Sequence, residues 1–159
     1  MVTFTNSYAD TNAGYDHANA MYIQGCDFVS CYAGACNLGV FKASEEAGDG
    51  TYCFAAANGQ FEESPDKIVA SVVKPINETI IEILREGQNN GKFRTDILSL
   101  GLKEKGVKLL FTDNTKLLEM ISDEQKEIIE ILTQEIIAGD ITIPGTEEEY
   151  NNFDYRYGE

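Results

Sequence analysis

The 159-residue chain has the length of one compact domain. Hydrophobic residues make up 43% of it and aromatic residues 10%, enough for a sizeable core, so the composition excludes wholesale disorder. Twelve basic residues against 27 acidic ones give a formal net charge of −15, which repels phosphate backbones and argues against a nucleic-acid partner. No stretch has the length of a membrane-spanning helix, and the residues from Met1 to Asn6 carry neither the basic nor the apolar region of a signal peptide.

Four short apolar runs in the first half of the chain have the length and composition of buried strands. They lie at 2–5, 27–32, 52–56 and 67–71. Helical patterns separate the first three runs, because apolar residues recur at helical spacing over 14–24 and over 40–47. This alternation predicts an α/β fold with a mainly parallel sheet flanked by helices on both faces.

A helix is predicted after Pro75, a residue that fits the first turn of a helix. Its apolar stripe consists of Ile76, Ile80, Ile83 and Leu84. Farther along the chain, two further runs have strand patterns, at 96–100 and 107–111, and a glycine-bounded turn joins them.

The last long helix is predicted from a capping box formed by Ser122 and Gln125. Gly139 ends this helix, and 141–143 has the pattern of a short edge strand. Four residues of the helix are expected to face inward: Ile128, Ile131, Leu132 and Ile136.

A ligand site is expected at one edge of the predicted sheet. In parallel sheets a ligand binds beyond the carboxyl ends of the strands, near helix N-termini. The segments that follow the predicted strands are 8–14, 33–39, 57–63 and 71–75. The sequence pattern alone leaves open what these loops bind.

The four cysteines, at positions 26, 31, 36 and 53, lie in the first third of the chain. Their spacing matches neither a zinc knuckle nor a disulfide scaffold, so we expect small buried thiols, with a disulfide, a metal ligand or a nucleophile as alternatives. His17 is the single histidine, which argues against a histidine-based metal centre. Only Cys36 stands at a predicted helix N-terminus, where a thiolate would be stabilised. A small enzyme built on Cys36 is therefore one functional hypothesis.

The run 27–41, DFVSCYAGACNLGVF, resembles the "GADVI…AAGGTGxGVF" segment of the basic membrane protein family. These are substrate-binding lipoproteins of ABC importers, with purine nucleosides as their best-known ligands. Residues 5–10 resemble the family's "TGSFxD", and 68–74 its "VLTSMVKR". Further matching segments, in the same order as in the family, are 91–93, 100–103, 106–107 and 138–144.

The resemblance implies one lobe of a two-lobe, type I periplasmic-binding-protein fold. Residues 1–144 match the Rossmann-like C-terminal ligand-binding lobe, and 145–159 form an acidic, aromatic-containing tail that we expect to be flexible. The implied function is the binding of a nucleoside-like solute within an ABC importer, without catalysis or cofactor. The implied partners are the solute, a missing N-terminal lobe and an ABC permease, and the full-length form would be an extracytoplasmic, membrane-anchored lipoprotein. A ligand-sensing regulatory module of the same fold is the alternative.

Carried over residue by residue, the resemblance assigns several ligand-binding positions. Tyr8 matches an aromatic residue that stacks on the solute base. Asp10 matches a family aspartate, although a helix cap is the role that its position favours. Lys74 matches a lysine that points its ammonium group toward the solute. Three small residues, Gly34, Ala35 and Cys36, stand at the family's "GGT" turn, where backbone N–H groups approach the ligand.

One departure from the family pattern affects ligand specificity. The family's "GVDSDQ" places an aspartate against the ribose hydroxyls, whereas this chain has Ala57 at that position. The loss of a charged acceptor weakens binding by about 1.5–3 kcal/mol unless Asn58 replaces it. The sequence therefore predicts the fold more firmly than the ligand.

Overall fold

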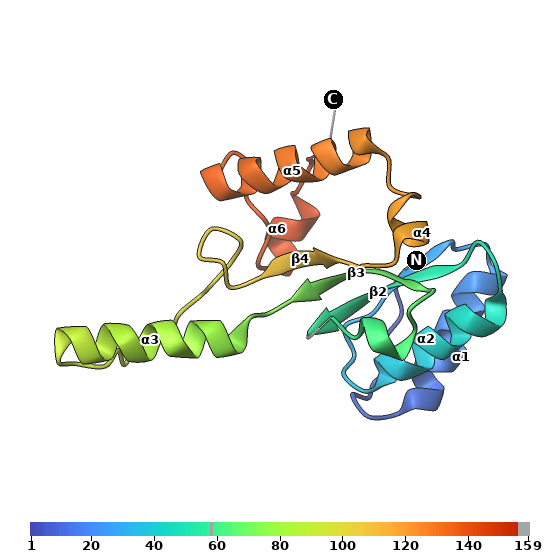
Figure 1. Cartoon of the computed structure of the whole chain (residues 1–159), viewed down its shortest axis with the longest axis horizontal. Helices are drawn as coiled ribbons and strands as arrows, with labels where there is room; N and C mark the ends of the chain where they lie inside the picture. The colour runs from blue at the N-terminus through green and yellow to red at the C-terminus, as the bar shows by residue number, and fades with distance from the viewer. Residues whose placement is uncertain (58, 156–159) are drawn as a thin grey trace.

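The structure is a computed structural model that describes residues 1–57 and 59–155. Its sheet has the strand order β1 (Phe28–Ser30), β2 (Tyr52–Ala57), β3 (Ile68–Val73) and β4 (Lys108–Phe111). The first three strands are parallel, and β4 pairs with β3 in the antiparallel direction. The mainly parallel α/β sheet expected from the sequence is confirmed (Figure 1).

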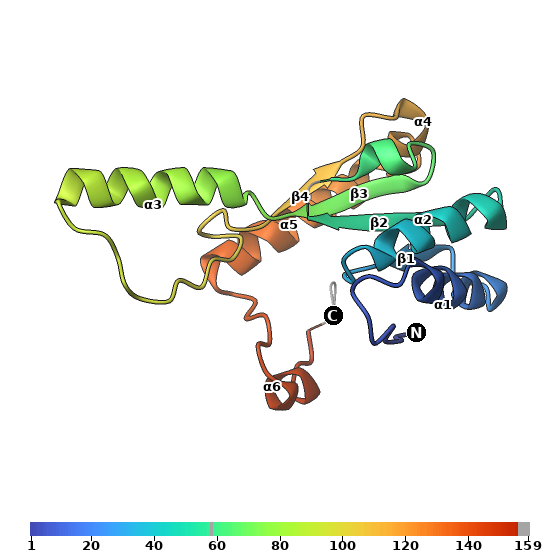
Figure 2. The same ribbon diagram turned by 90° about the horizontal axis from the view of Figure 1, so that it is seen from below.

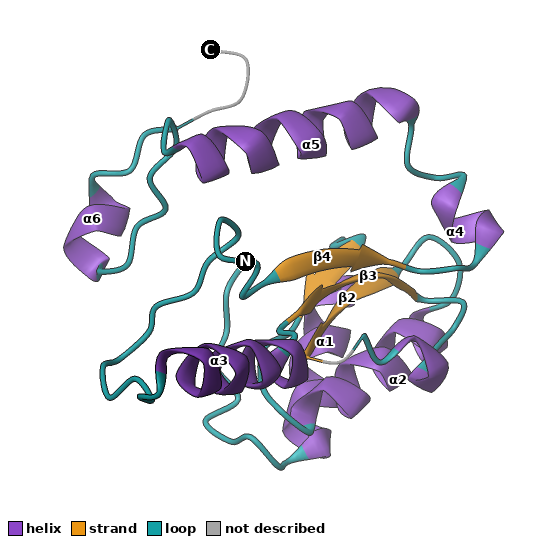
Figure 3. Ribbon diagram, turned by 60° about the vertical axis from the view of Figure 1, so that its left-hand side comes forward, coloured by secondary structure: helices purple, strands orange, loops and turns teal. Residues whose placement is uncertain are grey.

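The longer helices occupy different sides of this sheet. Helices α1 (Thr11–Ile23) and α2 (Cys36–Ala47) lie together on one face, and α5 (Asp123–Ala138) lies on the other (Figures 1 and 3). Helix α3 (Ile76–Asn90) projects beyond the end of the strands (Figure 2). The short elements are η1 (Phe61–Glu63), α4 (Thr115–Leu118) and α6 (Glu147–Asn151).

Two glycines let α1 and α2 cross at close range. A Cβ atom on Gly14 would collide with the carbonyl oxygen of Cys36, and one on Gly39 would collide with that of Thr11. The crossing covers one face of the sheet and closes the main core. The buried members of this core are Ala18, Tyr22, Val29, Cys31, Val40, Phe41, Ala43, Cys53, Ala55 and Ile68.

Three predicted strands are wrong. Residues 2–5, 96–100 and 141–143 have no ladder partner and no strand conformation. A strand needs hydrogen bonds from a neighbouring chain segment, and β-branched composition alone does not supply them. Ile97, in the middle of the second run, is 99% exposed.

The two long helices beyond β3 bury few of their apolar side chains. The apolar stripe of α3 is solvent-exposed, with Ile76 62% and Leu84 52% accessible. On α5 the capping box of Ser122 and Gln125 is confirmed, but no residue of that helix is fully buried. The inward-facing stripe predicted for α5 is therefore only half-buried.

The tail contains one helix that the sequence analysis did not predict. Thr146 and Glu149 form a capping box at the start of α6, and the Tyr155 hydroxyl donates to Glu135 of α5 at 2.9 Å. The flexibility of the tail stays a prediction. Across the described residues, no helix combines the length and apolarity needed to cross a bilayer.

Candidate functional site

The loop before α1 and the turn after β1 are joined at the carboxyl edge of the sheet. The backbone N–H of Ala35 donates to the carbonyl of Tyr8 at 2.8 Å. The thiol of Cys36 donates to the carbonyl of Ser7 at 3.2 Å. Gly34 has a φ of 59°, and a Cβ atom on it would lie 2.7 Å from the Tyr8 carbonyl oxygen. Only glycine fits this turn without strain.

A buried amide joins the turn after β1 to the loop after β2. Asn37 is only 3% exposed. Its Oδ1 atom accepts the backbone N–H of Ala33 at 3.1 Å, and its Nδ2 atom donates to Gln60 Oε1 at 3.3 Å. Gln60 itself has a left-handed φ of 53°. This hydrogen bond holds the two loops together. The sequence patterns did not predict it.

The signal that could have found this pair is partial. An asparagine in the first turn of a helix commonly bonds to nearby backbone, so the position of Asn37 after a predicted strand was informative. Gln60 lies 23 residues farther along, and a contact across that separation depends on the fold rather than on local pattern.

The other predicted ligand-binding residues have mixed surroundings. The ring of Tyr8 is 77% exposed, at the edge where it could stack on a flat solute. Asp10 caps α1 by accepting the N–H groups of Asn12 and Ala13, which confirms its capping role. Lys74 is exposed directly after β3, at the same edge as the carboxyl ends of β1 and β2. Asn58 lies outside the described residues.

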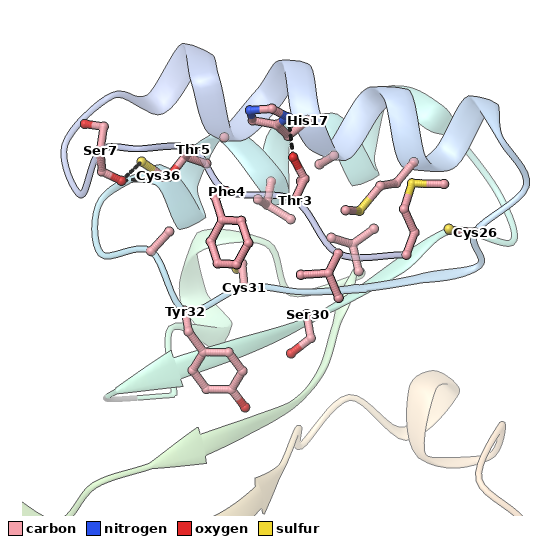
Figure 4. A pocket seen from close by; sticks show the side chains of 18 of the residues that line it. Thr3, Phe4, Thr5, Ser7, His17, Cys26, Ser30, Cys31, Tyr32 and Cys36 are labelled. Carbon is pink, nitrogen blue, oxygen red and sulfur yellow. Dashed lines mark hydrogen bonds between the residues drawn. The ribbon is translucent and has the colours of Figure 1, made fainter. Parts of the chain in front are cut away.

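A cavity of about 780 Å³ lies beside this edge, between residues 1–8, α1 and β1 (Figure 4). Tyr8 is part of its lining, and Cys36 and Cys26 lie at opposite ends of it (Figure 4). The predicted residues Gly34, Ala35 and Lys74 are not part of its lining. Thr3 Oγ1 and His17 Nδ1 are hydrogen-bonded at 3.1 Å, and this contact holds the first residues of the chain beside the cavity.

Two buried thiols of the core are poor nucleophiles. Burial raises the pKa of Cys31 to about 12 and that of Cys53 to about 12, so both stay protonated at neutral pH. Cys36 is fully buried and its S–H group is engaged with the Ser7 carbonyl. These surroundings do not support the hypothesis of an enzyme built on Cys36.

A metal centre has no basis in the part of the chain that the structure describes. No cluster of three or more histidine, cysteine, aspartate or glutamate side chains there could hold an ion. What the edge offers is an exposed aromatic ring, a lysine ammonium, and loops fixed by hydrogen bonds. These are groups with which proteins hold small molecules.

The fold is shared with solved solute-binding proteins. An ABC transporter solute-binding protein from Aeropyrum pernix K1 superposes with a TM-score of 0.75 and 25% identity, over 94% of this chain and 49% of that one. A transcriptional activator of the comK gene from Bacillus halodurans, 13% identical with a TM-score of 0.71, has the same fold over 87% of this chain and 46% of its own. The class defined by the first neighbour is that of ABC transporter substrate-binding proteins.

Curated relatives give the family. Basic membrane protein B of Borrelia garinii subsp. bavariensis is 29% identical over 94% of this chain and 41% of its own length. Basic membrane protein A of Borreliella burgdorferi is 28% identical over 94% of this chain and 43% of its own. The family model of PnrA-like ABC transporter substrate-binding proteins matches residues 1–147, and the chain belongs to this family. It spans about two fifths of the length of these curated relatives.

Proposed function

We propose that the chain is the C-terminal lobe, residues 1–144, of an ABC importer's substrate-binding protein, and that it binds a nucleoside-like solute at the carboxyl edge of its sheet. The observation that carries this proposal is that hydrogen bonds hold the loops at the carboxyl edge of the sheet in place. The Ala35–Tyr8 and Asn37–Gln60 hydrogen bonds hold three loops together where parallel sheets place their ligands.

Each edge residue has a proposed role toward the solute. Tyr8 offers a ring face for stacking, and the Lys74 ammonium is a hydrogen-bond donor. Gly34 and Ala35 let the solute approach the backbone, while Cys36 and Asp10 shape the two helix starts behind it. Asn58, the next residue in the sequence after Ala57, is proposed to replace the lost carboxylate with its amide. None of these roles requires catalysis or a cofactor.

The proposal includes partners outside this chain. A first lobe would close over the same edge and complete the solute site, and an ABC permease would receive the solute from the closed protein. The full-length form would be an extracytoplasmic lipoprotein. The length of the curated relatives, of which the matched region is about two fifths, supports a second lobe.

Titration of the chain with inosine, guanosine and adenosine, followed by calorimetry and by NMR shifts, tests this function. We expect weak binding, weaker than micromolar, with shifts confined to residues near Tyr8, Gly34 and Lys74. Tyr8→Ala should weaken binding by about 5- to 150-fold, which corresponds to 1–3 kcal/mol of stacking. Tyr150→Ala, an exposed tyrosine on α6, is the matched control and should have no effect.

Three results would contradict parts of the proposal. Sub-micromolar affinity would show that one lobe is a complete site. Shifts centred on α5 would place the site elsewhere. No response to any of the three nucleosides would reject the nucleoside-like solute.

A further inference from the structure

The cavity of about 780 Å³ between residues 1–8, α1 and β1 differs in composition from the rest of the chain (Figure 4). Charged residues make up 25% of the sequence and give it a net charge of −15. Among the described residues that line the cavity, none is aspartate, glutamate, lysine or arginine. A charged molecule that left water for this space would meet no side chain of opposite charge, so its entry would be costly. The lining therefore favours an uncharged occupant.

Aromatic rings from separate segments line this cavity. Phe4 belongs to the first residues of the chain, Phe28 to β1, and Tyr32 to the turn after β1. The ring of Phe28 stacks on that of Phe54 in β2, with the two centroids 5.4 Å apart. Phe4 is 78% exposed and Tyr32 61%, so both keep most of their surface available to a ligand. A molecule with an aromatic ring would bury this apolar surface and gain ring contacts.

The first residues of the chain form a wall of the cavity that is not part of the sheet. The hydrogen bond between Thr3 and His17 holds this wall at one point, and the hydrogen bond from Cys36 to the Ser7 carbonyl holds it at another. Between these points, residues 4–6 form no ladder with β1. A wall without backbone pairing between its two fixed points can adjust to the shape of a ligand.

The size of the cavity suits a small molecule. Ligand pockets of proteins measure about 300–1,000 Å³ and are mostly apolar, with a few polar groups that orient the ligand. The volume of about 780 Å³ falls within that range. Gly34, Ala35 and Lys74, three residues of the proposed solute edge, are outside the lining, so the cavity is a different space from the surface of that edge.

We propose that this cavity binds a small uncharged molecule that contains an aromatic ring. The ring would lie against Phe4, Phe28 and Tyr32, and a polar group of the ligand would bond to a hydroxyl group or to the imidazole of the lining. Binding would bury apolar surface that the chain leaves exposed and would hold residues 1–8 against α1 and β1. This site goes beyond the proposed solute binding and does not depend on it.

Titration with indole-3-acetamide, an uncharged aromatic probe, tests the site. The chain contains no tryptophan, so the fluorescence of the probe's indole ring is observed without an indole signal from the protein. We expect saturable one-to-one binding with a dissociation constant of about 1 mM or tighter. Indole-3-acetate and tryptamine have the same ring with one negative and one positive charge, and each should bind about tenfold more weakly or worse.

The variant Phe4→Ala removes one ring of the lining. It should weaken binding of indole-3-acetamide by about 2- to 13-fold, the range of one aromatic contact. Its thermal unfolding should not change, because Phe4 is exposed. Phe93→Ala removes an exposed ring outside the cavity, so it is the matched control and should leave binding unchanged.

Cys26 provides a second measurement. It is half-buried and lines the cavity, whereas the other three cysteines are buried, so a thiol reagent should modify Cys26 first. Indole-3-acetamide at ten times its dissociation constant should slow this modification about tenfold.

Several outcomes would overturn the proposal. Absence of saturable binding would reject the site and leave the cavity to another segment of a longer chain. Equal binding of the three probes would reject an uncharged ligand. Equal effects of Phe4→Ala and Phe93→Ala, or an unchanged rate of Cys26 modification, would show that the probe binds elsewhere. Displacement of the probe by inosine would show that the cavity and the solute edge are one site.

Discussion

At the scale of single residues, Gly34 controls the turn that joins Tyr8 to α2. Its φ of 59° and the nearby Tyr8 carbonyl oxygen act together, so Gly34→Ala should lower the free energy of unfolding by about 2–3 kcal/mol. Gly25→Ala is the control, since Gly25 also has a positive φ of 92° but nothing within 4 Å of a Cβ atom. Urea denaturation of both variants measures the difference. Equal losses would show that backbone strain alone sets the effect.

Two buried thiols should make the folded protein less stable at alkaline pH. Cys31 and Cys53 have pKa values raised from 9.0 to about 12 in the folded chain, so the unfolded chain loses these protons first as pH rises. Below pH 9 the free energy of unfolding should therefore keep the whole contribution of these thiols. Between pH 9 and 12 it should fall by up to about 1.4 kcal/mol per pH unit for each thiol.

Denaturation under reducing conditions across this pH range measures the loss. The double variant Cys31→Ala with Cys53→Ala is less stable at pH 7 because two buried side chains are shortened, but its curve should be flatter above pH 9. A slope identical to that of the unchanged protein would contradict the assignment to these thiols.

At the scale of elements, the crossing of α1 and α2 depends on glycine in the middle of a helix. Helix propensity alone predicts that Gly39→Ala stabilises α2 by about 1 kcal/mol. Because a Cβ atom would meet the backbone of Thr11 and Tyr15, we expect instead a net loss of about 3 kcal/mol. The shift in the thermal unfolding midpoint shows whether Gly39→Ala stabilises or destabilises the protein.

Gly87→Ala on α3 is the matched control for the loss of stability expected of Gly39→Ala. There the three atoms nearest to an added Cβ would all belong to the ring of Phe93, a half-exposed side chain that can move aside. The variant should be neutral or slightly stabilising. If both variants were destabilised equally, the close crossing of α1 and α2 would not be the cause.

How far the sequence predicts each element depends on how local its signals are. The capping box at Ser122 and the buried strands β2 and β3 were predicted because caps and apolar runs are encoded within a few residues. The runs at 2–5 and 96–100 look the same locally, but each needs a neighbouring strand that the described sheet does not provide. The pattern on α3 correctly gave an amphipathic helix, and its apolar side is solvent-exposed in the structure.

In the candidate site, too, the features with local sequence signals were predictable and those that depend on the fold were not. The position of the loops at the carboxyl edge followed from the predicted parallel order, and the capping role of Asp10 followed from its place before a helix. The Asn37–Gln60 pair could not be predicted, since it joins two loops through a contact that exists only once β1 and β2 lie side by side.

At the scale of the whole molecule, the core is concentrated in the first half of the chain. Every member of the main buried cluster lies between Ala18 and Ile68, on α1, α2 and the three parallel strands. Beyond β3 the buried side chains are scattered, among them Leu117 and Ile141. Local stability follows the density of buried apolar contacts, so the two halves should differ in how readily they open.

Amide hydrogen exchange measures this difference. We expect the amides of β2 and β3 to exchange only through global unfolding and those of α3 to exchange about a hundredfold faster or more, because α3 has hydrogen bonds but almost no packing. Helix α5, of similar length and half-buried, is the internal control and should be intermediate. Protection of α3 equal to that of β3 would contradict this prediction and would mean that α3 is stabilised by packing as close as that of the sheet.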